Sequence, residues 1–234
     1  MGGPVPCVLG IDPGRTGGGA AVLCAGLERP TALLAVCWTA RGERFTVRWA
    51  SRVPDVRVTL NQTEVYGIVA LGTGIGGLAT AGFVVGPVLA VVSESPYVGV
   101  DPQAALSVAR TGAALEAVAA ARLSDSRTVK TRTIEPTSWR RILGISAPDR
   151  ETAKERSLRD VPQLVVGLDE LLAELGQVDH VTDAAGVAAV GLRCAAWDGD
   201  PADWKARVGL ATGPRKSKPK KTPKAGPKRP GRPS

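Results

Sequence analysis

Near its amino terminus the chain reads Cys7-Val8-Leu9-Gly10-Ile11-Asp12-Pro13-Gly14, a short apolar run that ends in a carboxylate. Short runs of this kind, bounded by Gly and Pro, are typical of buried strands. A carboxylate at the end of such a strand loses hydration, which a cation or hydrogen bonds must replace. Asp12 is therefore either a metal ligand or a turn residue, since Asp-Pro-Gly also favours a turn.

A second apolar run also ends in a carboxylate. Residues Val84–Val92 are rich in Val, Ala and Leu, which predicts a central strand covered on both faces, and this run ends in Ser93-Glu94. Two carboxylates at the ends of interior strands repel each other unless a cation or a shared proton compensates. The alternative is that Glu94 is simply an exposed residue where a strand ends.

The last predicted helix runs from Asp179 to about Trp197. His180 and Asp183 lie three residues apart, so they share one face of this helix and can approach the same metal ion. His180 is the only histidine, and a lone histidine is more often a surface or cap residue than a ligand. Alternatively, Asp179 caps this helix, and Asp183 merely lies near its positively charged first turn. Together with Asp12 and Glu94, however, Asp183 would complete a composite acidic site.

Further strands and helices are indicated by apolar periodicity, glycine and proline. Strands are predicted at Ala20–Ala25, Thr31–Thr39 and Val129–Ile134, and helices at about Asn61–Phe83, at Pro102–Leu123, from Pro136, at Arg150–Arg159 and at Val161–Leu175. The segment Arg41–Leu60 is either a strand or an excursion.

Positive charge is concentrated at the carboxyl terminus. The net charge is +8, yet residues 214–234 hold nine Lys and Arg and no acid, which leaves −1 for the remainder. A Pro/Lys/Gly tail predicts disorder, and it favours binding to nucleic-acid phosphates over a purely solubilising role. The segment Lys228–Pro233 resembles an AT-hook, although it lacks the Arg directly before the Gly. The candidate DNA-binding residues of the tail are Lys220, Lys221, Arg229 and Arg232.

The four cysteines are scattered, without a Cys-x-x-Cys pair. This spacing argues against a zinc ribbon or a redox dithiol and suits a reducing compartment. No apolar stretch carries the flanks of a membrane helix or a signal peptide. We therefore expect a cytoplasmic protein that does not bind membranes.

The order of these elements resembles the RNase H-like fold, and within it the RuvC family of Holliday junction resolvases. The matching motifs are Gly10–Gly14, Glu94 with an aromatic residue three places on, His180–Ala184 and Ala109–Ala113. The resemblance covers roughly Val5–Trp197. It implies an α/β protein with a mixed central sheet flanked by helices. We expect a nuclease domain over residues 1–200 and a basic disordered tail over residues 201–234.

The resemblance also implies a catalytic centre and a substrate. Divalent metal ions, two Mg²⁺ or Mn²⁺, would be held by Asp12, Glu94, His180 and Asp183. A homodimer would cut a four-way DNA junction, one strand per subunit. Tyr97 falls where the family stacks an aromatic on unpaired bases, and Arg140 and Lys154 fall near basic residues that face the scissile phosphate.

Departures from the family and rival functions remain open. The long segment Arg41–Leu60, the Gly-rich segment Leu71–Gly82 and the basic tail suggest a divergent, phage- or plasmid-encoded member. One rival is a YqgF-like nuclease that acts on RNA or other branched DNA. Another is an actin-like sugar kinase or ATPase, in which an Asp-x-Gly turn binds phosphate. A third is a non-catalytic DNA-binding protein whose acidic cluster is only structural.

Overall fold

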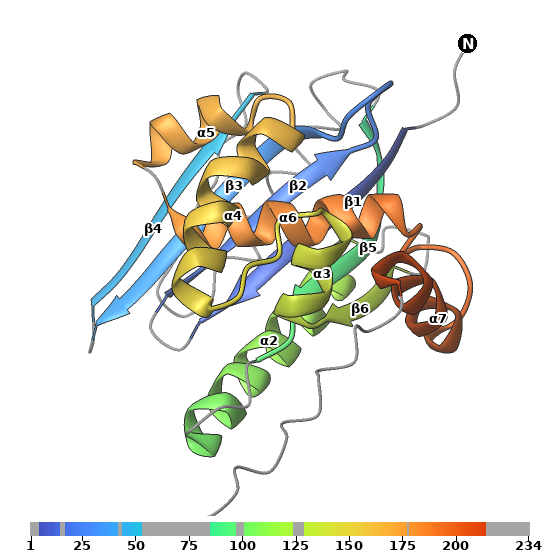
Figure 1. Cartoon of the computed structure of the whole chain (residues 1–234). Coiled ribbons are helices and arrows are strands. Elements are labelled where there is room, and N and C mark those ends of the chain that lie inside the picture. Colours follow the sequence, from blue (N-terminus) through green and yellow to red (C-terminus); the bar gives the residue numbers. More distant parts are fainter. Residues whose placement is uncertain are drawn as a thin grey trace, which may run out of the picture.

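The computed structural model describes residues 5–14, 17–41, 44–52, 85–96, 101–123, 129–176 and 178–213. Its strands are β1 (Val5–Pro13), β2 (Gly17–Cys24), β3 (Thr31–Arg41), β4 (Arg44–Ser51), β5 (Val85–Glu94) and β6 (Lys130–Ile134). Its helices are α2 (Pro102–Leu123), α3 (Pro136–Ile142), α4 (Arg150–Leu164), α5 (Leu168–Leu175), α6 (Asp179–Arg193) and α7 (Pro201–Thr212). In this part of the chain the strands form one sheet with helices on both faces (Figure 1).

The sheet is mixed, and β1 lies inside it. The strand order is β4-β3-β2-β1-β5-β6. Strands β1 to β4 form an antiparallel meander, whereas β5 runs parallel to β1 and β6 runs parallel to β5. The carboxyl ends of β1 and β5 therefore meet at the same edge of the sheet.

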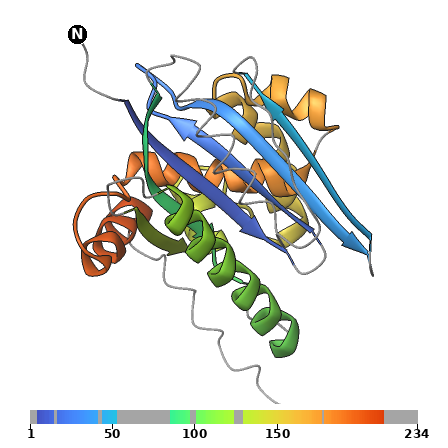
Figure 2. The same ribbon diagram turned by 180° about the vertical axis from the view of Figure 1, so that it is seen from behind.

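Alternate side chains of β1 enter two separate cores. Cys7, Leu9 and Ile11 pack with Leu115 of α2 in one apolar cluster, while Val8 packs in the other cluster with residues of α3 to α7. Figures 1 and 2, taken from opposite sides, show α6 across one face of the sheet and α2 across the other. Because side chains alternate along a strand, the acidic ends of β1 and β5 project on the α6 face.

Small residues bring α6 close to the sheet. A Cβ at Gly10 of β1 would lie 2.8 Å from the Cβ of Ala188, and one at Gly19 of β2 would lie 2.6 Å from the backbone oxygen of His180. Real Cβ atoms do not approach this closely, so glycine at these two positions allows the contact. Ala184 and Ala188 of α6 are fully buried. The first turns of α6 are thereby held over the end of β1.

Most of the predicted elements that the structure describes are confirmed. The helix predicted over Pro102–Leu123 spans those residues, and Asp101 accepts two hydrogen bonds of 3.0 Å from backbone N–H groups of its first turn. For the segment Arg41–Leu60 the strand interpretation is confirmed in β4, which pairs with β3. The helix predicted over Asn61–Phe83 lies outside the described residues.

The folded domain extends beyond the boundary that composition predicts. Residues 201–212, expected to belong to the tail, form α7. Asp200 caps this helix by accepting hydrogen bonds from two backbone N–H groups of its first turn. Trp204 is 4% exposed, and its indole N–H donates to the carbonyl oxygen of Thr133 at 3.1 Å. These local contacts order the segment as far as Gly213, and the basic residues 214–234 lie outside the described residues.

The strand order, the strand directions and the helices on both faces form the RNase H-like mixed α/β sheet that the sequence predicts. Strand β4 adds an antiparallel edge to this sheet. Among the helices that the structure describes, none is both long enough and apolar enough to cross a membrane.

Candidate metal centre

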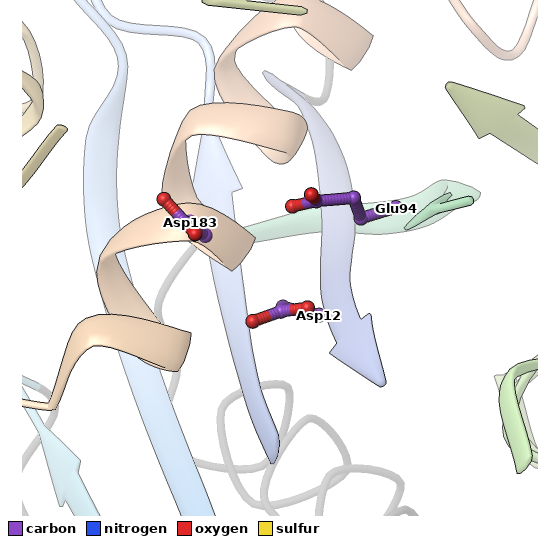
Figure 3. Close-up of side chains that lie close together, drawn as sticks. All are labelled: Asp12, Glu94 and Asp183. Carbon is purple, nitrogen blue, oxygen red and sulfur yellow. The ribbon is translucent and has the colours of Figure 1, made fainter. Parts of the chain in front are cut away.

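Three carboxylates from three different elements converge at the carboxyl ends of β1 and β5. Figure 3 shows Asp12 from β1, Glu94 from β5 and Asp183 from α6 with their carboxylates close together. One carboxylate oxygen of each residue lies within 4.8 Å of those of the other two. Across the described residues, this is the one group of three or more His, Cys, Asp or Glu with spacing suited to a metal ion.

The register of the parallel strands explains this meeting. Ile11 of β1 pairs with Ser93 of β5, so the next residues along, Asp12 and Glu94, project on the same face of the sheet. Asp183 lies in the second turn of α6, above that face. These three acids, widely separated in sequence, therefore come together in the fold.

Burial and mutual repulsion perturb the acids of this cluster. Burial first, and then the neighbouring charges of Asp12 and Asp183, raise the pKa of Glu94 well above its ordinary value. Burial also raises the pKa of Asp183 to about 6, although the ion pair with Arg140 opposes the shift. At an effective dielectric constant of about 20, two like charges 4.8 Å apart repel by roughly 3 kcal/mol. Three ionised carboxylates in this space therefore call for a cation.

The donor set fits a hard divalent cation. Carboxylate oxygens are the ligands that Mg²⁺ and Mn²⁺ prefer. Burial, the main cause of the raised pKa values of Glu94 and Asp183, disfavours their charged forms, and a bound cation would stabilise those forms. The acidic triad is thus able to bind a metal ion.

His180 lies beside the cluster and contacts Asp12. Its Nδ1 is 2.5 Å from Oδ2 of Asp12. This hydrogen bond is the main cause of the raised pKa of His180, and burial opposes it. The side chain of His180 is 39% exposed, so the imidazole also faces solvent. Its role as a fourth metal ligand stays a prediction.

Two basic residues that the resemblance places near the scissile phosphate, Arg140 and Lys154, lie beside the first two turns of α6. Arg140 donates from its terminal nitrogen to Oδ2 of Asp183 at 2.9 Å, and from Nε to Oγ of Ser157 at 3.1 Å. Lys154 forms an ion pair with Asp179 at the start of α6. The Arg140 side chain is 14% exposed and that of Lys154 is 55% exposed. Positive charge therefore borders the acidic cluster, partly buried and partly open to solvent.

The other predicted site residues cannot be placed relative to this cluster. Tyr97, Lys220, Lys221, Arg229 and Arg232 lie outside the described residues. Their contacts with DNA stay predictions.

Two residues of the site were not identified from sequence. Trp139 is fully buried, and its indole N–H donates to Oε2 of Glu94 at 3.3 Å. Ser157 is 1% exposed and accepts the hydrogen bond from Arg140. In sequence, Trp139 directly precedes Arg140, and Ser157 follows Lys154 by three residues. This closeness does not reveal that Trp139 contacts Glu94 or that Ser157 contacts Arg140.

Comparisons with known proteins find solved structures of low similarity. Neither a protein-family model nor a curated protein sequence matches this chain. Thermus thermophilus RuvC in complex with a Holliday junction substrate is similar at 19% identity and a TM-score of 0.48, over 88% of this chain and 96% of that one. A further Thermus thermophilus RuvC structure is similar at 19% identity and a TM-score of 0.46, over 81% and 97% of the two chains.

The yeast mitochondrial Holliday junction resolvase Ydc2 is also similar, at 15% identity and a TM-score of 0.36, over 88% of this chain and 82% of that one. The fold of the present chain is assigned from its own strand order and strand directions.

Proposed function

We propose that this chain is a metal-dependent endonuclease of the RuvC type, which cuts four-way (Holliday) DNA junctions in recombination and repair. The observation that carries the proposal is the convergence of Asp12, Glu94 and Asp183 on one face of the sheet, bordered by Arg140 and Lys154. Clustered carboxylates suit divalent ions, and adjacent Arg and Lys suit phosphate. Hydrolysis of a phosphodiester bond requires both.

In this proposal the three carboxylates hold two Mg²⁺ or Mn²⁺ ions, with His180 as a fourth ligand. Such ions, when bound, activate a water molecule for attack on phosphorus and stabilise the leaving oxygen. The chain itself supplies rigid positioning, because Asp12 and Glu94 lie on paired strands and Asp183 lies on a helix packed against them. The hydrogen bond from His180 further restrains Asp12.

Arg140 has two tasks in this mechanism. In the metal-free protein its guanidinium partly compensates Asp183. An arginine carries five N–H donors, and the two that hold Asp183 and Ser157 leave others for a phosphate oxygen beside the cluster. Lys154, which is more exposed, would contact the DNA backbone further out.

The remaining parts of the proposal concern assembly and DNA contacts. Paired nicks on the two strands of a junction need two active sites, so we propose a homodimer. Tyr97 would stack on unpaired bases at the crossover. The basic residues 214–234 would add salt-dependent affinity for phosphates.

The test uses the full-length protein with a labelled four-way junction, a matched linear duplex and a structured RNA, each in Mg²⁺ with and without EDTA. We expect paired symmetric nicks on the junction that EDTA abolishes. Binding without cutting in any divalent ion would contradict the proposal and favour a structural DNA-binding protein. Preferential cutting of the RNA would favour a YqgF-like nuclease, and stabilisation by nucleotide without any cutting would favour an actin-like kinase.

A further inference from the structure

Trp139 connects the acidic cluster to the core of the domain. Its side chain is fully buried, and its indole N–H donates to Oε2 of Glu94 at 3.3 Å. A buried Trp needs an acceptor for its N–H. Trp204 meets this need with the backbone carbonyl of Thr133. Trp139 instead uses a carboxylate of the candidate metal centre.

The Trp139 ring is held in place by α6, the helix that carries Asp183. A Cβ at Gly186 of α6 would lie 2.5 Å from Cζ3 of the ring and 3.0 Å from Cε3. The ring therefore occupies space on α6 that only a glycine leaves free. The guanidinium carbon of Arg140 also lies over the ring, 4.6 Å from its centroid. Trp139 thus contacts Glu94, α6 and Arg140 at the same time.

We propose that Trp139 is a positioning residue that fixes the Glu94 carboxylate for metal binding. The inference rests on one part of the proposed function, the binding of a divalent ion by Asp12, Glu94 and Asp183. The terminal torsion of a Glu side chain is broad, so a carboxylate without a fixed partner adopts many orientations. Trp139 restricts them, and among the described residues it is the one hydrogen-bond donor to the Glu94 side chain.

The hydrogen bond leaves Glu94 free to act as a ligand. A carboxylate offers about four lone-pair sites, and a single N–H uses one of them. Outer hydrogen bonds that orient a metal ligand typically change metal affinity by about 10-fold to 100-fold when they are removed. A purely structural Trp139 would instead change stability and leave metal affinity as it is.

The test measures binding of Mn²⁺ alone to the full-length protein by isothermal titration calorimetry, beside urea unfolding. Trp139→Phe removes the N–H and keeps an aromatic ring in the core. Trp204→Phe is the matched control, because it removes a buried indole hydrogen bond that ends on a backbone carbonyl. We expect Trp139→Phe to weaken Mn²⁺ binding by about 10-fold or more, and Trp204→Phe to keep the affinity of the unaltered protein. Unchanged affinity in Trp139→Phe, or an equal loss in both variants, would overturn the inference.

A second measurement needs no substitution in the core and decides the matter if Trp139→Phe fails to fold. The five tryptophans give five indole N–H signals in a ¹H–¹⁵N spectrum of the unaltered protein. Saturating Mg²⁺ should shift the signal of Trp139, identified by its proximity to Gly186, because its acceptor becomes a metal ligand. The Trp204 signal should stay in place. An unmoved Trp139 signal would overturn the inference.

These outcomes separate the positioning role from the proposed function. If the unaltered protein binds Mn²⁺ but leaves four-way junctions intact, the proposed function fails, and calorimetry still tests Trp139. If it cuts junctions and Trp139→Phe keeps full Mn²⁺ affinity, the positioning role alone fails. Absence of Mn²⁺ binding by the unaltered protein would overturn the positioning role outright.

Discussion

The end of β5 presents two adjacent residues to opposite faces of the sheet, and their surroundings differ. On the α6 face, Glu94 joins Asp12 and Asp183. On the α2 face, the hydroxyl of Ser93 donates to Oε1 of Glu116. Burial raises the pKa of both glutamates. Glu116, however, belongs to no group of metal-ligating residues among those that the structure describes.

The comparison teaches that a buried carboxyl does not by itself mark a metal site. The buried carboxyl of Glu116 accepts one hydrogen bond from a neutral hydroxyl, an arrangement that needs no bound cation. Glu94 also faces the charges of two neighbouring acids, and one indole N–H cannot balance them. Acids that converge from separate elements, rather than the burial of a single acid, indicate a metal site.

The packing of the two faces explains why the acids meet on only one of them. The α2 face is filled by large apolar side chains such as Leu9, Ile11 and Leu115. On the α6 face, Gly10, Gly19 and the alanines of α6 let the helix backbone lie against the strands. Close contact brings a helix-borne acid within reach of two strand-borne acids.

The largest difference between the two faces is expected in catalysis. If Glu94 holds the proposed metal ion, which would supply several kcal/mol of transition-state stabilisation, Glu94→Gln should lower cleavage by roughly 10³-fold. Glu116→Gln keeps an oxygen acceptor for Ser93 and should cut at nearly the rate of the unaltered protein. Single-turnover cleavage of a four-way junction in Mg²⁺ measures both. Equal losses in the two variants would contradict the functional distinction between the faces.

A second effect concerns the pH dependence of stability. The pKa of Asp183 is about 6 in the folded protein, above its ordinary value. The folded state therefore binds this proton more tightly than the unfolded chain, and it loses that advantage as the pH rises through 6. The raised pKa values of Glu94 and His180 act in the same direction. From about pH 5 to about pH 7 the metal-free protein should lose roughly 1–2 kcal/mol of unfolding free energy, measured in urea.

Mg²⁺ should reverse this loss, because divalent ions bind deprotonated carboxylates. Glu116 on the α2 face, whose pKa burial also raises, should contribute to the slope that remains in Mg²⁺. Glu116→Gln should reduce the slope that remains in Mg²⁺, and Asp183→Asn should remove part of the slope that responds to Mg²⁺. A slope that is the same with and without Mg²⁺ would show that the cluster does not bind the ion.

A third difference is expected between two hydroxyls of the same kind. Ser157 on α4 and Thr111 on α2 each donate to the carbonyl four residues earlier. Ser157 also accepts a hydrogen bond from Arg140. Ser157→Ala should destabilise the protein by about 1.5–3 kcal/mol, the usual contribution of a hydrogen bond to a charged group, and should slow cleavage as Arg140 loses its restraint. Thr111→Ala is the control and should leave cleavage unchanged. Equal cleavage by the two variants would remove Ser157 from the site.

The smallest effect on the catalytic step is expected from deletion of residues 214–234. This change removes nine cations and should leave the single-turnover rate at saturating protein intact. Each phosphate contact contributes about 0.9 to the slope of log affinity against log salt, so the loss of three contacts would lower that slope by roughly 3. Fluorescence anisotropy with a labelled junction over a salt series measures it. An unchanged slope would show that the tail does not contact phosphate.

The sequence predicted the framework of the site because its signals are local. Apolar runs and turn residues identify the strands that end in Asp12 and Glu94, and helical spacing places His180 and Asp183 on one face. These signals are independent of the rest of the fold. Once β1 and β5 are paired, the alternation of side chains along each strand determines the face on which Asp12 and Glu94 project.

The contacts between elements could not be predicted in the same way. The bond from Trp139 to Glu94 depends on how α3 packs against the sheet, and the bond from Ser157 to Arg140 depends on the position of α4. No local pattern encodes either. Helix α7 is different, since Asp200 is a recognisable helix cap, but the basic composition that follows it obscured this signal.

The most direct test of the central claim is cleavage of a four-way junction by the unaltered protein and by Asp12→Asn, with junction affinity measured in parallel. The account predicts cutting that requires Mg²⁺, and its loss in Asp12→Asn with junction affinity retained, because the substitution removes a ligand charge and spares Arg140 and Lys154. Cutting by Asp12→Asn at the rate of the unaltered protein would contradict the account.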